Sequence, residues 1–235
     1  MLKDQFNNTV YTSDYEIICL LNQFENNFLG YKKSTIKILS LSKKYDNFIL
    51  FQLHAALICI FMDSTKGFND ANKYLKNCKK LIDNQPATDR ELYYFNFLNE
   101  LLIKNFFKSL SYLDTLIKKN TKDLFFAKLG QIFYFSIGNN KKIKDLAELI
   151  MKDNKKNPYA LSMLSFALEE SNQIEEAKKY ASKAMDIDPN DPWAHHTFAH
   201  IFEVENNPDK GITFLQNLSS YWNDCNSFIY THNWW

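Results

Sequence analysis

Glycine and proline are scarce in this sequence of 235 residues, which contains five of each. An all-β chain needs a turn about every ten residues, and such turns draw heavily on glycine and proline. A chain of helical hairpins needs only one breaker at each connection. The scarcity therefore favours an all-α fold, and a hydrophobic content of 46% is enough for a folded core.

An excess of either charge is also lacking, because the sequence contains 28 lysines and arginines and 27 aspartates and glutamates. Proteins that bind the phosphate backbone usually carry a basic excess, so we expect no nucleic-acid partner. No apolar run reaches the roughly 18 residues of a membrane-spanning helix, and the apolar stretch from Ile49 to Met62 is interrupted by Gln52 and His54. The N-terminal residues lack the apolar core of a secretion signal. We therefore expect no membrane association and a cytoplasmic location.

Several motifs of enzymes and metal sites are absent. The four cysteines, at positions 19, 59, 78 and 225, form no CxxC pair, which indicates neither a redox motif nor a four-thiolate zinc site and favours buried, inert thiols. A glycine-rich phosphate loop, a GxSxG elbow and a dinucleotide-binding fingerprint are missing too. These absences disfavour nucleotide-dependent enzymes and serine hydrolases.

A helical-repeat pattern is present, and it is clearest between Asn157 and Glu203. Small and apolar residues recur there at helical spacing, and Pro189 ends the second helix because proline cannot continue it. Two antiparallel helices with this pattern are typical of a tetratricopeptide unit. The recurring residues are Leu161, Leu164, Ser165, Leu168, Ala177, Ala181 and Ala184.

Looser hairpins precede this unit and another follows it. They start near residues 14, 46, 89, 123, 158 and 192, and the intervals of 32 to 43 residues are those of helix-pair repeats. Thr88 and Glu91 have the spacing of a capping box at one start. No linker rich in proline, glycine or serine divides the array. We therefore predict an all-α, right-handed superhelix of tetratricopeptide-like hairpins, with one domain over residues 13–235 and an N-terminal extension over residues 1–12.

The helix that begins at Trp193 has two faces when its residues are placed at about 100° each. One face is mainly apolar and should pack on neighbouring helices: His195, Phe198, Ala199 and Phe202. The other is mainly polar: Trp193, His196, His200 and Glu203. First helices line the concave surface of a tetratricopeptide array, so we expect the polar face in the groove, opposite Glu169 and Glu170 of the preceding unit.

The spacing of His196, His200 and Glu203 would let all three side chains reach one ligand or one metal ion. Two imidazoles and a carboxylate could hold Zn²⁺ or non-haem iron. The spacing differs from HExxH, because Thr197 stands where that motif has glutamate. Two alternatives stay open: a metal-free ligand or peptide site, and a structural network in which the histidines hydrogen-bond to carboxylates such as Glu169 and to the tryptophans.

Four segments resemble the tetratricopeptide repeat protein 38 family, which includes StaR-like bacterial proteins: FALEE at 166–170, DPWAHHTFAHIFE at 191–203, GITFL at 211–215 and HNWW at 232–235. The resemblance is strong from about Pro158 to Trp235 and diffuse from about Leu29 to Lys156. It implies a helical-repeat fold and brings no settled activity. The matching residues are Glu169, Glu170, Trp193, Ala194, His196, Ala199, His200, Glu203, His232, Asn233, Trp234 and Trp235.

The resemblance also bears on the extent of the chain. The family pattern continues past HNWW, so we expect this chain to be the N-terminal half of a longer protein, truncated at the start of a further repeat. In the register of that repeat, His232 and Trp235 would turn toward the groove.

Two functions remain open from the sequence. One is a scaffold whose groove binds a peptide, a protein partner or a small ligand, and the other is an enzyme with a His/Glu groove site that could depend on a metal. The sequence requires no cofactor and identifies no catalytic residue. Convergence of the groove histidines and Glu203 within a few Å would favour chemistry, whereas an open trough would favour partner binding. The groove candidates are Glu169, Glu170, Trp193, His196, His200, Glu203, His232 and Trp235.

Overall fold

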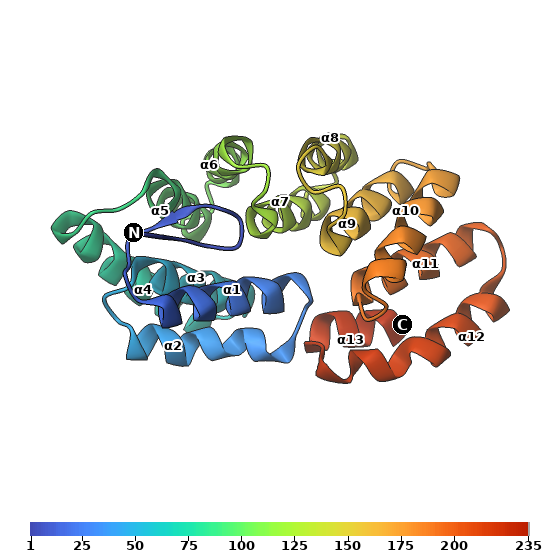
Figure 1. The fold of residues 1–235 in the computed structure, drawn as a ribbon, viewed down its shortest axis with the longest axis horizontal. Coiled ribbons are helices and arrows are strands. Elements are labelled where there is room, and N and C mark those ends of the chain that lie inside the picture. Colours follow the sequence, from blue (N-terminus) through green and yellow to red (C-terminus); the bar gives the residue numbers. More distant parts are fainter. Residues whose placement is uncertain (235) are drawn as a thin grey trace. The chain divides into compact units, whose positions relative to one another are not determined.

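The computed structural model of this chain describes residues 1–234. Their regular structure is almost entirely helical, apart from one two-stranded antiparallel sheet at the N-terminus (Figure 1). The predicted all-α fold of helical hairpins is therefore confirmed. Trp235, which we expected in the groove, lies outside the described residues.

The elements follow one another as strands and then helices. In chain order they are β1 (Leu2–Lys3), β2 (Thr9–Val10), α1 (Tyr15–Leu29), the 3-10 helix η1 (Lys33–Lys37), α2 (Ile38–Lys44), α3 (Ile49–Phe61), α4 (Thr65–Asn84), α5 (Asp89–Leu102), α6 (Phe106–Lys119), α7 (Leu124–Ser136), α8 (Asn140–Met151), α9 (Pro158–Glu169), α10 (Ile174–Ile187), α11 (Pro192–Val204), α12 (Pro208–Leu218), the 3-10 helix η2 (Ser219–Asp224) and α13 (Ser227–Trp234). The predicted hairpin starts agree with the first residues of α1, α3, α5, α7, α9 and α11 to within three residues.

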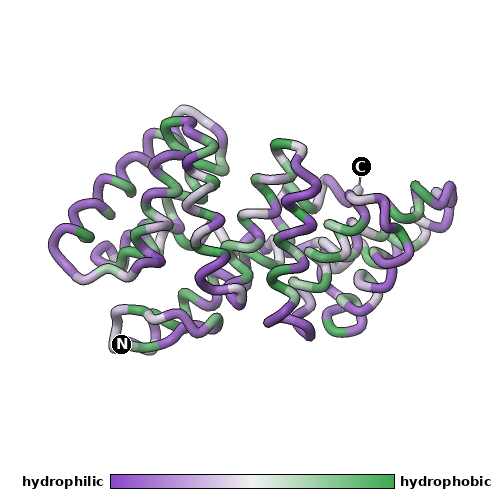
Figure 2. Tube along the Cα trace, turned by 90° about the horizontal axis from the view of Figure 1, so that it is seen from above, coloured by the Kyte–Doolittle hydropathy of each residue, from purple (hydrophilic) through white to green (hydrophobic). Residues whose placement is uncertain are grey.

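Local chemistry explains where these helices begin and end. Asn157 and Asp191 cap α9 and α11 through their side chains, with proline in the first helical turn. The capping box of Thr88 and Glu91 at the start of α5 is confirmed. After α9 and α11 the chain adopts the left-handed conformation at an asparagine, where many helices have a glycine. Asn172 has φ 58° and Asn206 has φ 54°. Figure 2 shows hydrophobic and hydrophilic residues alternating along most helices, as expected of helices that bury one face.

Contacts divide the chain into two compact units, and the single domain over residues 13–235 stays a prediction. Unit 1 consists of Met1–Glu25 and Ser34–Phe126, and unit 2 consists of Asn26–Lys33 and the chain from Ala127 onward. Helices α1 and α7 each contribute residues to both units. No helix of the described chain is long and apolar enough to cross a membrane.

The residues predicted as an N-terminal extension are part of the packing of unit 1. β1 pairs with β2, and Asp4, Phe6 and Val10 are buried. Periodicity could not predict this hairpin, because each strand has only two residues. The expectation of buried thiols is correct for three cysteines, but Cys19 is exposed.

A buried ion cluster around Arg90 connects the N-terminal hairpin to the helices of unit 1. The guanidinium pairs with Asp4, donates to Glu25 Oε1 at 2.6 Å, and places Nε 3.5 Å from Asp123 Oδ2. Asp123 also accepts from the amide of Phe125 in the first turn of α7. Burial raises the pKa of Glu25 to about 8, and Arg90 opposes that shift. The cluster thus fixes the hairpin, α1, α5 and the start of α7 together.

Candidate functional site

The three histidines of α11 have different environments. His195 is fully buried; its Nδ1 accepts from the indole N–H of Trp222 at 3.0 Å, and its Nε2 lies 2.9 Å from the carbonyl oxygen of Pro189. These partners place the single ring proton on Nε2, where it donates to Pro189. Burial lowers the pKa of His195 to about 4. His195 is therefore a satisfied core histidine, on the face where the helical phase predicted it.

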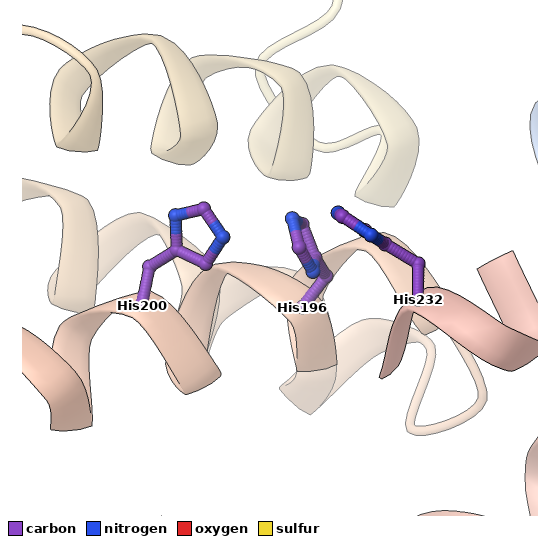
Figure 3. Close-up of side chains that lie close together, drawn as sticks. All are labelled: His196, His200 and His232. Atoms are coloured by element: carbon purple, nitrogen blue, oxygen red, sulfur yellow. The ribbon is translucent and has the colours of Figure 1, made fainter. Parts of the chain in front are cut away.

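His196 and His200 lie on another side of α11, and α13 brings His232 beside them. One ring nitrogen from each lies within 4.8 Å of those from the other two. The ring centroid of His196 is 4.4 Å from that of His200 and 4.4 Å from that of His232. Figure 3 shows the rings in a row, with His196 in the middle. Burial lowers the pKa of His196 to about 2, and the charges of the nearby His200 and His232 contribute to the same shift.

A carboxylate from α9 contacts this histidine cluster. Glu169 Oε1 lies 3.3 Å from Nδ1 of His200, and the Glu169 side chain is only 10% exposed. The hydrogen bond to Glu169 raises the pKa of His200, with further contributions from the charges of Glu169, Glu170 and Glu203. Glu169, Glu170 and His200 form a second group with ligand atoms within 4.8 Å of one another. Carboxylates at the ends of α9 and α11, the first helices of two successive hairpins, thus act on the imidazole of His200.

Glu203, predicted from helical spacing as a metal ligand, is exposed and stands in neither of these groups among the described residues. It lies one residue before the end of α11 and acts on His200 through its charge. His232 joins His196 and His200 in the first of these groups, whereas the sequence proposed Glu203 beside them. The metal-binding role of these residues stays a prediction.

Trp193 is covered by aromatic rings, although the sequence placed it in an open groove. Its ring stacks on Tyr31 at 5.4 Å and lies 4.8 Å from the ring of Phe166. Lys128 Nζ sits 3.9 Å from the Trp193 ring centroid and donates to Gln131 Oε1 at 3.0 Å. Trp193 is therefore 7% exposed and is part of the packing behind His196.

Lys128 was missed by the sequence analysis. It is only 3% exposed, and burial lowers its pKa while the charge of Asp191 opposes the shift. Burial likewise raises the pKa of Asp191. The available signal was a single charged residue in the mainly apolar run LFFAKLGQIFYF of α7, since a charge is buried only beside compensating groups.

Several buried polar atoms near the histidine cluster have no hydrogen-bond partner. In the described part of unit 2 they include Oε2 of Glu169, Nε1 of Trp193 and Oδ1 of Asn233. Asn233 uses its amide nitrogen to donate to the carbonyl of Pro192 at 3.1 Å. Buried polar atoms normally have partners, so this concentration distinguishes the region from an ordinary core.

No protein-family model matches this chain. Solved structures of MamA, a tetratricopeptide-like helical-repeat protein, are similar to it. MamA 41-end from Desulfovibrio magneticus RS-1 has a TM-score of 0.50 and 14% identity, covering 74% of this chain and 94% of that chain. The MamA RS-1 ArsTM double mutant has a TM-score of 0.49 and 14% sequence identity, and the match covers 74% of this chain and 93% of that chain. MamA from AMB-1 has a TM-score of 0.46 and 13% sequence identity, and the match covers 77% of this chain and 96% of that chain. The first of these similarities confirms the tetratricopeptide-like fold, and at such identity it shows the fold alone.

Proposed function

We propose that this chain is a tetratricopeptide-type scaffold of the tetratricopeptide repeat protein 38 family, and that the first-helix face of unit 2 binds a positively charged segment of a partner protein. The observation that carries the proposal is the gathering of Glu169 and Glu170 around His200, with ligand atoms within 4.8 Å of one another, beside the exposed Glu203 of α11. Negative charge on one face complements lysine and arginine side chains.

Solvent access and an aromatic neighbour support this choice of partner. Glu203 is exposed and Glu170 is half-buried, so both carboxylates can contact a partner from outside. Phe135 on α7 is 47% exposed and packs edge-on against Phe166 of α9 at 5.3 Å. An exposed ring beside carboxylates can also receive a cationic side chain on its face.

Family membership is supported by contacts between the segments that resemble the family. Glu169 of FALEE contacts His200, and His232 and Asn233 of HNWW contact His196 and Pro192 of the DPWAHH segment. Motif residues separated by dozens of positions therefore meet in one place. That arrangement is what a shared site would require.

Binding of labelled peptides, measured by fluorescence anisotropy, tests the scaffold function. Peptides rich in lysine and arginine should bind, acidic peptides of equal length should not, and salt should weaken the complex. Changing Glu170 and Glu203 together to glutamine should weaken binding about tenfold, as expected for losing roughly 1.4 kcal/mol of charge interaction.

The matched control changes Glu175 and Glu176, two exposed acids in the first turn of α10, to glutamine. This double variant has the same net charge as the groove variant and should bind like the unchanged protein. Equal losses in both double variants, or a preference for acidic peptides, would contradict the proposal.

An enzyme with a His/Glu site is the second candidate, favoured by the convergence of His196, His200 and His232. Three imidazoles with an open coordination position are the ligand set of hydrolytic zinc sites. Turnover of ester, amide or phosphoester substrates by metal-loaded protein, lost in His200→Ala, would support it. Absence of turnover across such a panel would leave the scaffold as the function.

A further inference from the structure

The histidine cluster differs from the satisfied network that a structural role would require. Both ring nitrogens of His195 have partners, in Trp222 and Pro189. His200 has Glu169 on one nitrogen. For His196 and His232 the described residues provide ring contacts and electrostatic influence but no hydrogen bond. Imidazole nitrogens that lie within 4.8 Å of one another, with no hydrogen bond from His196 or His232 to the described residues, are the arrangement that a shared cation would stabilise.

Glu169 provides a second, independent observation. Its side chain is nine-tenths buried, and Oε2 has no hydrogen-bond partner, although Oε1 contacts His200 Nδ1. Metal-bound histidines commonly donate their second ring N–H to a carboxylate, which fixes the ring and the tautomer. With Nδ1 held by Glu169, the Nε2 atom of His200 is the one left to coordinate.

We propose that His196, His200 and His232 bind one divalent transition-metal ion, with zinc the best match, and that Glu169 positions His200 for coordination. Three imidazoles suit zinc, which takes nitrogen ligands at about 2.0–2.1 Å and leaves a fourth tetrahedral position open. Ligands at that distance are roughly 3.4 Å apart in a tetrahedron. The nitrogens now lie within 4.8 Å, so modest side-chain rotations on α11 and α13 close the site.

The group of Glu169, Glu170 and His200 is the competing ligand set, and it shares His200. It would place one nitrogen and two carboxylate groups around the ion, a set that suits manganese better than three imidazoles do. The three-histidine set keeps the contact of Glu169 with His200, whereas the competing set would use that carboxylate as a ligand. Metal preference and the Glu170→Gln variant therefore separate the two sets.

Titration of the untagged full chain, stripped of metal with a chelator and then dialysed, tests the proposal. Calorimetry should give one Zn²⁺ per chain, with weaker binding of Mn²⁺ and Mg²⁺. Co²⁺ should give the visible absorption of a four-coordinate site. His196→Ala, His200→Ala and His232→Ala should each weaken zinc binding at least about 100-fold, and Glu169→Gln should weaken it about 10- to 100-fold.

Glu175→Gln is the matched control, because Glu175 is an exposed acid in the first turn of α10, outside the three-histidine set. Zinc affinity should stay unchanged in this variant, Glu170→Gln should weaken it less than loss of a histidine does, and circular dichroism should confirm the helical fold of each variant. If His232→Ala fails to fold, His232→Gln replaces it.

Absent zinc binding, zinc binding that survives His232→Ala, or a manganese preference lost in Glu170→Gln would each overturn the proposal. The outcome is independent of the scaffold function. Peptide binding depends on Glu170 and Glu203, whereas zinc binding depends on His196 and His232, so failure of one leaves the other intact.

Discussion

Two polar clusters, one buried in unit 1 and one half-buried in unit 2, differ in how their groups are paired. In unit 1 the guanidinium of Arg90 stands among three carboxylates, from Asp4, Glu25 and Asp123, and at most 9% of any of the four side chains is exposed. In unit 2 three imidazoles meet beside Glu169, and one ring nitrogen of each lies within 4.8 Å of those of the other two. The first cluster includes its own cation, whereas the second gathers bases that can receive one.

The useful distinction is whether the charges of a cluster are compensated within the chain. Groups that pair within the chain should affect stability when they are changed. Groups that are left unpaired should affect binding instead.

The largest effect should follow from removing Arg90. Arg90→Ala leaves three carboxylates buried without their cation, and breaking such a pair costs about 3–5 kcal/mol of unfolding free energy. Urea denaturation monitored by circular dichroism measures it. Lys119→Ala, which removes an exposed partner of Asp89, is the control and should change stability little. An Arg90 variant as stable as this control would show that the cluster does not hold unit 1 together.

A smaller effect should distinguish two histidines of unit 2. His195→Ala removes the partner of the Trp222 indole and should cost about 1–3 kcal/mol, because a buried donor is left unpaired. His232→Ala removes a half-buried ring without a hydrogen bond to the described residues and should cost less than about 1 kcal/mol without added metal. Thermal melts of the two metal-free variants make the comparison. Equal losses would favour a structural role for both histidines.

A third effect, a dependence of stability on pH, comes from unit 1. Burial raises the pKa of Glu25 from 4.5 to about 8, so the stabilising contribution of its protonated form is complete below about pH 4.5 and is lost as the pH rises through about 8. Glu25→Gln removes this titration and should flatten the decline in stability between pH 5 and pH 9. Denaturation midpoints across that range test it. If stability falls with pH equally in the unchanged protein and in Glu25→Gln, the raised pKa of Glu25 is contradicted.

Signals within single helices predicted most of the fold. Proline and capping residues marked the starts of α9 and α11, and the helical phase of α11 put His195 on the packed face, apart from His196 and His200. Such signals act over a few residues, so they survive in a sequence whose earlier repeats are degenerate. The hairpin starts were therefore predictable.

Long-range pairings were not predictable in the same way. Asp4 meets Arg90 across 86 positions, and Tyr31 covers Trp193 from the end of α1; neither pairing has a periodic signal. Helical spacing selected Glu203 as the third ligand because it compares residues of one helix only. His232 stands beside His196 because α13 packs against α11, and the sequence indicated it only through the resemblance of HNWW to the family.

The most direct test of the zinc site is anomalous X-ray scattering at the zinc edge from crystals of the full chain grown with zinc. We expect one peak at about 2.0–2.1 Å from a ring nitrogen of each of His196, His200 and His232, with Glu169 on the far nitrogen of His200. A peak coordinated by Glu169 and Glu170, or no peak near the three histidines, would contradict the account.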